Sequence, residues 1–435
     1  MKLLRERLAA LVEQQAQRHA WLKLLLDRHL PDPAERHEHA ANVMLRAGMS
    51  ALATDLMARQ IAAIRASLLP GRPTVALFSP LPAYRHHFGT LLDTLGAAGC
   101  NAIGIYSDVV GDIFDRHPRA FYVPGDQVPE LDFVDVTITN TLIGTLPRGS
   151  RNVLLVHDIQ DSPMGERAEF LRFAGGFDYF VVASTGGVDS MKRIMRAKVI
   201  EGGPARFERP MKCIVPAGYV RLDQNIRDFE RLGAAPDAII YAPTVDLPAF
   251  GEHSSIGAYG FELVRHLMER FPDRTIIFRP HPNTRNKAAI ERIVAAFSGD
   301  PRFVHDANKS DYMSSYARSA LMLTDMSGTA YTYAFTTLRP VVFFAPSQAR
   351  VPGVDGQERY FRDRERVGAV VDRVEDVAGA IRGVLAGPHR ERIEALRGEL
   401  IFNVGGAERY LAENLAHMVD GTPKADWIYL TSPDL

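Results

Sequence analysis

The sequence predicts an α/β protein built from two Rossmann-like domains in succession. Its 435 residues exceed what one hydrophobic core usually supports, so two domains are expected. Short apolar runs alternate with helical stretches in both halves of the chain, which is typical of parallel sheets covered by helices. The clearest unit is LMLTDMSGTAYTYAFTTLRPVVFF, residues 321–344, which has the pattern strand, tight turn, helix, strand.

Changes in the hydrophobic pattern along the chain indicate where the domain boundaries lie. We expect a helical extension over residues 1–70, an N-terminal Rossmann-like domain over 71–235, a C-terminal one over 236–385, and helices with a tail over 386–435. The Pro70-Gly71-Arg72-Pro73 sequence ends the extension. The tail from Asp420 onward is polar.

Each domain then has its own series of strands and helices. In the first domain, strands are expected at residues 74–80, 101–107, 134–140, 152–158, 179–185 and 212–218, with a helix over 84–98. In the second domain, strands are expected at residues 238–244, 321–325, 341–344 and the start of 366–381, and residues 274–282 are expected to form a strand and its exit loop. Helices are expected over 261–270, 313–318 and the remainder of 366–381.

The helical extension carries apolar residues on one face, including Leu4, Leu8 and Leu11. Mixed charge is typical of surface helices, so we favour packing of residues 1–68 on the next domain or on a second copy of the chain. The alternative is a peripheral membrane contact, which the basic residues of this segment permit.

Composition excludes several classes of protein. The net charge of −1 argues against a nucleic-acid partner, because such proteins are normally basic. No run of 18 apolar residues is present, and the charged N-terminus does not resemble a signal peptide. Cys100 and Cys213 are far apart and are expected to be buried in a reducing compartment. We therefore expect a cytoplasmic protein, with the inner face of the membrane as the alternative location.

Several motifs are missing from the sequence. No GxGxxG opens the first helix, and neither a P-loop nor a GxSxG elbow occurs. No group of His, Cys, Asp and Glu has metal-ligand spacing. We therefore expect no metal and no cofactor, and we disfavour ATP hydrolysis and covalent serine catalysis.

The turn in residues 321–344 is a candidate phosphate site. Gly328 permits close approach of a ligand, and Ser327 and Thr329 offer hydroxyl groups at the start of a helix. The unpaired N–H groups of a helix N-terminus attract anions, and phosphate is the usual occupant. The alternative is an ordinary capped turn. Ser255 lies before a second helix and is either a similar contact or, as we favour slightly, an N-cap.

Two histidines end predicted strands, where ligand crevices form in α/β folds. His157 ends the apolar strand in LLVHD and is a candidate general base, because the unperturbed pKa of a histidine side chain lies near neutrality. His281 and Arg279 alternate in FRPHP, where they suit the charge of a pyrophosphate leaving group. The alternatives are a His157 that only binds a loop and a solvated strand end at His281. The loop 79–87 contains further candidate acceptor contacts, although adjacent histidines at a helix start are more often simply exposed; these residues are Arg85, His86 and His87.

These pieces, in this order, resemble the CDP-glycerol glycerophosphotransferase family of teichoic-acid-type polymerases over roughly residues 150–385. The family's strand ending in His-Gly-Thr-Pro is matched by VHDIQDSPMG, with His157 kept and Asp158 in place of Gly. Its other elements are matched by GYVRLD (218–223), YAPT (241–244), RPHP (279–282), TDMSG (324–328) and RPV (339–341). Val220 replaces the family's Pro, and Gly328 replaces its second Ser.

The resemblance implies a GT-B fold and transfer without a metal from a nucleotide-activated donor, CDP-linked by preference, to a hydroxyl acceptor on a lipid or polymer of the cell surface. The first domain would hold the acceptor and the second the nucleotide donor. His157 would deprotonate the acceptor, and His281 would act with the phosphate-binding residues as the nucleotide leaves. Those phosphate-binding residues would be Arg279, Ser327, Gly328 and Thr329. Nucleotide or substrate contacts would come from Asp325, Arg221, Asp223, Ser255, His305 and Lys309.

Two other functions fit the same pattern. One is a nucleotide-sugar glycosyltransferase or epimerase of GT-B fold, because the Ser-Gly-Thr turn also resembles turns in such enzymes. The other is a non-catalytic GT-B shell that binds a partner through residues 1–68.

Overall fold

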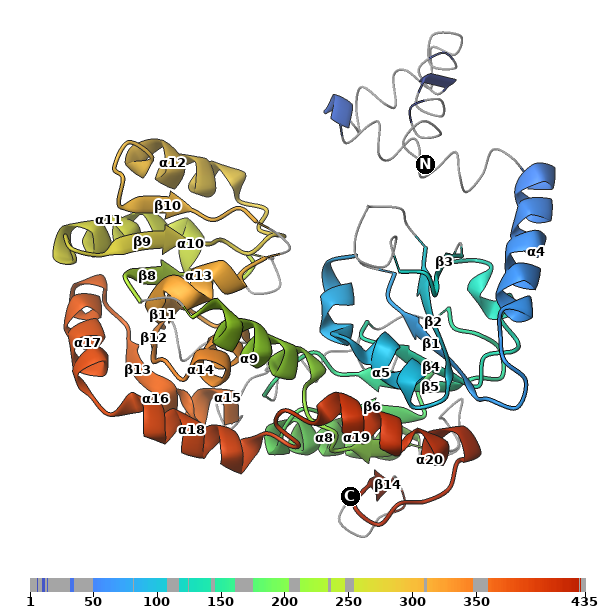
Figure 1. Ribbon diagram of the computed structural model, residues 1–435. Coiled ribbons are helices and arrows are strands. Elements are labelled where there is room, and N and C mark those ends of the chain that lie inside the picture. The colour runs from blue at the N-terminus through green and yellow to red at the C-terminus, as the bar shows by residue number, and fades with distance from the viewer. Residues whose placement is uncertain are drawn as a thin grey trace.

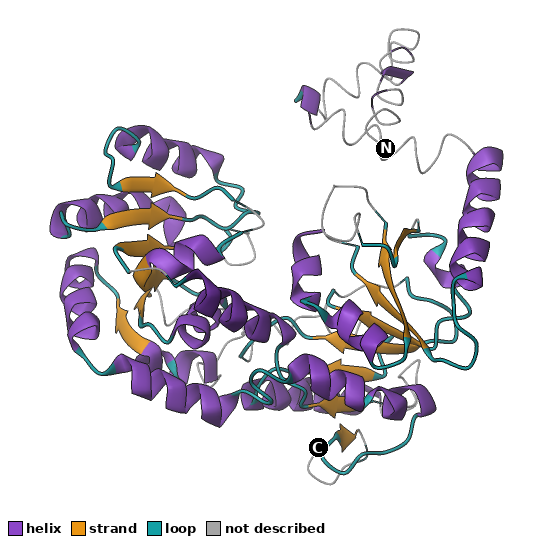
Figure 2. Cartoon of the chain, in the orientation of Figure 1, coloured by secondary structure: helices purple, strands orange, loops and turns teal. Residues whose placement is uncertain are grey.

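The computed structural model describes most of the chain from residue 50 onward. The described residues are 50–80, 82–107, 117–123, 125–141, 145–160, 175–202, 212–233, 236–246, 254–308, 311–346, 359–429 and 431, with residues 6, 10, 11, 14 and 32–34 of the N-terminal segment. Two domains stand side by side, each with a sheet between layers of helices (Figures 1 and 2). The expected α/β class with two Rossmann-like domains is confirmed.

The first domain is built around an eight-stranded sheet with the order β14-β7-β6-β5-β4-β1-β2-β3. Its strands are parallel except for β14, which pairs antiparallel with β7. Their bounds are β1 (Thr74–Phe78), β2 (Asn101–Tyr106), β3 (Ala120–Tyr122), β4 (Val136–Thr139), β5 (Arg151–Leu155), β6 (Tyr179–Val181), β7 (Cys213–Val215) and β14 (Ile428–Tyr429).

The second domain has a six-stranded parallel sheet with the order β10-β9-β8-β11-β12-β13. Its strands are β8 (Ala238–Tyr241), β9 (Thr275–Phe278), β10 (Phe303–His305), β11 (Ser319–Thr324), β12 (Val341–Phe344) and β13 (Gly368–Val371). In both sheets the strand order reverses between the first and the fourth strand, β1 and β4 or β8 and β11. Doubly wound sheets bind ligands at the carboxyl ends of these strands.

Helices cover the sheets on both faces (Figure 2). In the first domain they are α4 (Ser50–Ala66), η1 (Pro82–Phe88), α5 (Leu91–Ala97), η2 (Val128–Glu130) and α8 (Thr185–Gly202). In the second domain they are α10 (Ser255–Ala258), α11 (Gly260–Arg270), α12 (Lys287–Phe297), α13 (Met313–Arg318), α14 (Thr329–Thr337), α15 (Arg359–Arg362), α16 (Arg364–Val367) and α17 (Val374–Ala386). Helices α9 (Val220–Leu232), α18 (His389–Leu400), α19 (Ala407–Glu413) and α20 (Leu415–Asp420) join the two domains.

Helix α9 is shared between the two cores. Val220, at its start, belongs to the cluster that includes Val75 and Leu77 of the first sheet. Leu222, two residues later, belongs to the cluster of the second domain with Phe343. The C-terminal helices make the opposite crossing, since α18 packs on the second domain while α19 and α20 return to the first (Figure 1). The chain therefore connects the domains twice.

Two sequence-based expectations are wrong in detail. The helix expected over residues 84–98 is interrupted at Gly89, which has φ +52°, and the N–H and hydroxyl of Thr90 donate to Glu408 at 2.8 and 2.7 Å. The C-terminal tail is not simply polar. Trp427 is buried against Tyr179, and the strand that follows it extends the first sheet.

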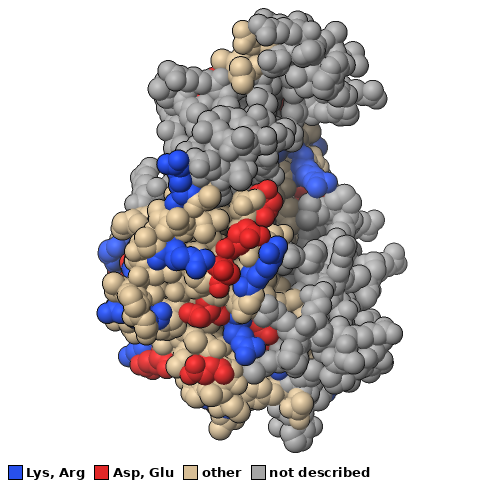
Figure 3. All heavy atoms as spheres, turned by 90° about the vertical axis from the view of Figure 1, so that its right-hand side faces the viewer, with Lys and Arg blue, Asp and Glu red and all other residues tan. Residues whose placement is uncertain are grey.

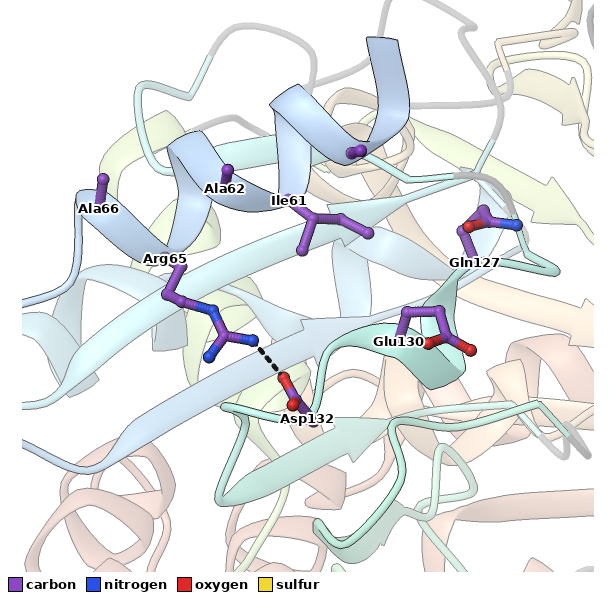
Figure 4. A pocket seen from close by; sticks show the side chains of 8 residues that line it. Ile61, Ala62, Arg65, Ala66, Gln127, Glu130 and Asp132 are labelled. Carbon is purple, nitrogen blue, oxygen red and sulfur yellow. Dashed lines mark hydrogen bonds and ion pairs between the residues drawn. The ribbon is translucent and has the colours of Figure 1, made fainter. Parts of the chain in front are cut away.

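Helix α4 packs on the first domain. Ile64 is fully buried with Phe78 and other residues of the first sheet, and Arg65 forms an ion pair with Asp132 at 2.5 Å (Figure 4). A groove of about 650 Å³ lies beside the helix; it is lined by Ala58, Ile61, Ala62, Arg65, Ala66, Gln127, Glu130 and Asp132. The remaining expectations for residues 1–49 fall outside the described residues, apart from the few positions named above.

The outer face of the first domain carries positive and negative side chains interspersed (Figure 3). This distribution agrees with the formal charge of −1. Within the described ranges, no helix is long and apolar enough to cross a membrane.

Candidate functional site

The carboxyl ends of the central strands bring several polar side chains of the first domain together. Asn140 follows β4, His157 lies two residues after β5, and Tyr84 lies in η1, which follows β1. Both His157 and Tyr84 are partly exposed, and their rings meet edge to face with 5.0 Å between centres. This cluster lies at the reversal of strand order, where a ligand is expected.

A backbone carbonyl determines the tautomer of His157. Its Nδ1 lies 3.1 Å from the carbonyl oxygen of Asn140. Because a carbonyl only accepts, Nδ1 must carry the hydrogen, and in the neutral ring Nε2 keeps a lone pair. No hydrogen bond to Nε2 is formed within the described residues. The ring is thus oriented as a proton acceptor.

A second histidine is bonded to the same strand end. The hydroxyl of Tyr219 donates to the carbonyl oxygen of His157 at 2.7 Å and lies 2.9 Å from Nδ1 of His87. The rings of His87 and His157 are 5.4 Å apart between centres. Burial lowers the pKa of His87 well below 6.5, and the nearby His86, His157 and Arg221 lower it further. His87 is therefore neutral at neutral pH.

The second domain contributes a histidine of the opposite tautomer. Nδ1 of His281 accepts a hydrogen bond from the backbone N–H of Asn283 at 3.1 Å. In the neutral ring Nε2 must then carry the hydrogen and act as a donor. Burial and the charge of Arg279 lower the pKa of His281 below 6.5, while Asp246 opposes this shift, so the neutral form dominates at neutral pH.

Arg279 is held in place by an acidic partner. Its guanidinium forms an ion pair with Asp306 at 2.5 Å, and both side chains are 12% exposed. Asp306 also accepts a hydrogen bond from the hydroxyl of Ser315. Asp306 therefore offsets the charge of Arg279 and restricts its direction. His305, at the end of β10, stacks on Phe278, and burial lowers its pKa.

The Ser-Gly-Thr turn leads into α14 as expected. Ser327 is buried, and its hydroxyl accepts a hydrogen bond from the N–H of Thr329 at 3.3 Å. Its carbonyl accepts one from the hydroxyl of Tyr360 at 3.1 Å. Gly328 is exposed and Thr329 is partly exposed, so this end of the helix is accessible to a ligand.

Asp325 lies two residues before Ser327 and connects the turn to neighbouring segments through hydrogen bonds. It is buried, and its carboxylate accepts hydrogen bonds from the N–H of Thr244 at 2.8 Å and from the N–H and hydroxyl of Ser255, both at 2.7 Å. Burial raises the pKa of Asp325 above its ordinary value, although these hydrogen bonds act in the opposite direction. Asp325 and Ser255, expected as substrate contacts, are thus partners of each other that join the ends of β8 and β11.

The two domains meet at this turn. A Cβ built on Gly328 would lie 3.9 Å from Oδ1 of Asp158, the residue that follows His157. The strand end that carries His157 therefore faces the N-terminus of α14. A carboxylate at this position would repel an anion bound at the turn.

Two of the predicted substrate contacts make hydrogen bonds to groups of the protein. Arg221 donates to the hydroxyl of Tyr312 at 2.7 Å and to the carbonyl of His86 at 3.4 Å, which connects the domains. Asp223 is buried and accepts hydrogen bonds from the N–H groups of Gly405 and Ala407 at 2.6 and 2.8 Å. Lys309, the remaining predicted contact, lies outside the described residues.

Some residues of the site were missed from sequence. Asn140 ends the predicted strand 134–140, so the strand-end argument that selected His157 applied to it as well. Tyr219 and Asp306 had no such signal, because their roles depend on contacts distant in sequence. Among the described residues, no group of three or more His, Cys, Asp and Glu is arranged to hold a metal ion.

Comparison with protein families finds one match. The model for CDP-glycerol:poly(glycerophosphate) glycerophosphotransferases matches residues 155–383, which is more than half of the 435 residues. The matched segment begins at the end of β5 and ends in α17, so it includes His157, His281 and the Ser-Gly-Thr turn. A comparison with curated proteins finds no match.

Solved structures share the fold at low sequence identity. The wall teichoic acid polymerase TagF is 15% identical, with a TM-score of 0.54 over 86% of this chain and 96% of that chain. The S. aureus MnaA-UDP co-structure is 14% identical, with a TM-score of 0.51 over 80% and 97%. UDP-GlcNAc 2-epimerase from Neisseria meningitidis bound to UDP-GlcNAc is 10% identical, with a TM-score of 0.51 over 79% and 99%. These similarities support the GT-B-like arrangement of the two sheets.

Proposed function

The chain belongs to the CDP-glycerol:poly(glycerophosphate) glycerophosphotransferase family, and from this premise we propose that it moves a glycerol-phosphate unit from CDP-glycerol to a hydroxyl acceptor on a lipid or polymer. A related polyol-phosphate or glycosyl unit on another nucleotide diphosphate is the broader form of the same proposal. Family membership supports a nucleotide-linked transferase. The site residues support the division of roles that follows.

The opposite tautomers of His157 and His281 carry this proposal. On one side, Nε2 of His157 has a lone pair that takes the proton of the acceptor hydroxyl. The oxygen then attacks the phosphorus of the transferred unit, and the bond from that phosphorus to the nucleotide monophosphate breaks. On the other side, the Nε2–H of His281 and the guanidinium of Arg279 stabilise the negative charge that develops on the phosphates.

The N-terminus of α14 supplies the remaining donor contacts. The exposed turn at Gly328 and Thr329 presents the end of a nine-residue helix, whose N–H groups favour a phosphate. Asp325 and Tyr360 hold the turn, and we assign them positioning roles. The transferred unit would lie between this turn and His157, the two features that Asp158 and Gly328 bring near each other.

One variant should lose turnover but keep its binding of the donor. We expect His157→Gln to lower kcat with CDP-glycerol by about 10²–10⁴-fold, the usual contribution of a general base. The same variant should keep the thermal stabilisation by CDP-glycerol, because a ligand that binds only the folded state raises the melting temperature. His389→Gln is the control, since His389 lies on α18 and bonds to Arg392, and it should keep wild-type turnover.

The same thermal-shift panel should include CDP-ribitol, UDP-sugars and CMP-sugars. Stabilisation by UDP-sugars alone would contradict the CDP-linked donor and favour a nucleotide-sugar enzyme. Full activity of His157→Gln would contradict its role as the base. If no nucleotide stabilises the protein, the transferase proposal itself fails.

A further inference from the structure

We propose that His87 binds a second hydroxyl group of the acceptor, beside the hydroxyl that His157 deprotonates. This inference rests on the proposed function and adds a residue that determines which acceptor is used. It predicts that the acceptor ends in a polyol with neighbouring hydroxyl groups rather than in a single alcohol.

Tyr219 determines the tautomer of His87. Its hydroxyl has one hydrogen, and the carbonyl oxygen of His157, 2.7 Å away, has no hydrogen of its own to offer. The hydrogen of Tyr219 therefore goes to that carbonyl, and Nδ1 of His87, 2.9 Å from the same hydroxyl, must donate to it. Nε2 of His87 is left with a lone pair. Burial, which lowers the pKa of His87, keeps it in this neutral form.

The free nitrogen of His87 belongs to a ring that a ligand can reach. His87 and His157 are both partly exposed, and their ring centres lie 5.4 Å apart. Tyr84 stacks on His87 at 5.8 Å and meets His157 edge to face at 5.0 Å. In the described part of the chain, Nε2 of His87 makes no hydrogen bond. A small polyol can therefore contact both imidazoles at once.

The Nε2 lone pairs of His87 and His157 determine which chemical groups of a ligand can bind there. A neutral imidazole with its hydrogen on Nδ1 accepts at Nε2 but cannot donate there. It therefore binds a hydroxyl, which supplies a hydrogen, and does not favour a phosphate oxygen, which supplies none. His157 uses its lone pair to take the proton of the reacting hydroxyl. The second lone pair, on His87, then fits a hydroxyl on the neighbouring carbon of the same acceptor.

Two synthetic acceptors and two variants test this. The acceptors end in 2,3-dihydroxypropyl phosphate or in 3-hydroxypropyl phosphate, which lacks the neighbouring hydroxyl, and CDP-glycerol is the donor. We expect the wild-type kcat/KM to be about tenfold higher for the diol, the worth of roughly one hydrogen bond. His87→Asn keeps a donor near Tyr219 but has no group at the position of Nε2, so it should use both acceptors equally. His87→Gln places an amide oxygen near that position and should retain part of the preference.

The outcomes are distinguishable. If wild type and His87→Asn both transfer to the two acceptors with the same ratio, His87 does not bind the second hydroxyl, although the proposed function stands. A uniform loss for both acceptors in His87→Asn, with the diol preference intact, also contradicts the inference and indicates a structural role. If the wild-type protein transfers to neither acceptor from any nucleotide donor in the panel, the proposed function fails and this inference fails with it.

Discussion

At the scale of single residues, the imidazoles of the site differ in which nitrogen is occupied. His157 and His87 both donate from Nδ1, to a backbone carbonyl and to a tyrosine hydroxyl, and both keep a lone pair at Nε2. His281 accepts at Nδ1 and donates at Nε2. Proton acceptors are thus placed in the first domain and a proton donor in the second, which is the distribution that transfer to a hydroxyl requires.

The lowered pKa of His87 should make the free energy of unfolding depend on pH. Its pKa is lowered in the folded protein, so the unfolded chain binds more protons below pH 6.5. The stabilisation is fully present above pH 6.5 and is lost as the pH falls toward the folded pKa. We expect the free energy of unfolding to fall with acidification below pH 6.5, with His87 contributing a slope of up to about 1.4 kcal/mol per pH unit.

Urea denaturation of wild type and His87→Phe between pH 7.5 and 5 measures this contribution. The variant should show a shallower decline than wild type, whatever its stability at pH 7.5. Curves that run parallel over this range would show that His87 titrates normally in the folded protein.

At the scale of elements, the Ser-Gly-Thr turn depends on the buried carboxylate of Asp325. Asp325 directly follows β11. Its carboxylate binds the loop after β8 through Thr244 and the first residue of the short helix α10, Ser255. Tyr360 binds the turn from the other side through the carbonyl groups of Asp325 and Ser327. The Ser-Gly-Thr turn is therefore preorganised by buried contacts rather than by its own sequence.

We expect Asp325→Asn to lower the free energy of unfolding by about 2–4 kcal/mol. The amide has a single oxygen that can accept hydrogen bonds, whereas the carboxylate has two. Chemical denaturation measures the loss, and hydrogen exchange should show faster exchange at Thr244 and Ser255. Asp311→Asn is the control. Asp311 is exposed and precedes the N-cap of α13, where it accepts a hydrogen bond from the N–H of Met313, so its replacement should cost about 1 kcal/mol or less. Equal losses in the two variants would mean that Asp325 is not the stronger support.

At the scale of the whole molecule, the two crossings of the chain set how the domains sit. The first crossing is α9, whose Val220 and Leu222 belong to different cores. The second crossing passes close to Gly218, which has φ +97°. A Cβ added at Gly218 would lie 2.3 Å from the carbonyl oxygen of Phe402. A side chain at Gly218 would therefore clash with the returning segment. The carboxylate of Asp223 accepts hydrogen bonds from the N–H groups of Gly405 and Ala407 in the returning segment.

Asp223→Ala should leave two N–H groups without a partner at the start of α19. We expect a loss of about 2–4 kcal/mol in the free energy of unfolding and faster hydrogen exchange over residues 405–413. Asp228→Ala, on the same helix, removes only a surface ion pair with Arg231 and should cost about 0.5 kcal/mol. If exchange over 405–413 is unchanged in Asp223→Ala, the second crossing does not depend on this carboxylate.

Local patterns were sufficient for the class of fold and for much of the candidate site. The strand runs, the turn at Ser327 and the strand-end histidines His157 and His281 are properties of short segments, and parallel sheets bring strand ends to one edge. The same reasoning could have found Asn140. It misplaced the helix over residues 84–98, because the interruption at Gly89 and Thr90 depends on Glu408.

Only the tertiary structure showed which partner each polar side chain binds. Arg221, Asp223 and Asp325 are predicted substrate contacts. Their hydrogen bonds to Tyr312, to the start of α19 and to the loop after β8 were not predicted. A carboxylate or guanidinium suits a ligand and a backbone group equally well, and only the packing of distant segments decides between them. The sequence by itself therefore determines the class of fold and the family, whereas the packing of distant segments decides which polar side chains are bonded within the protein.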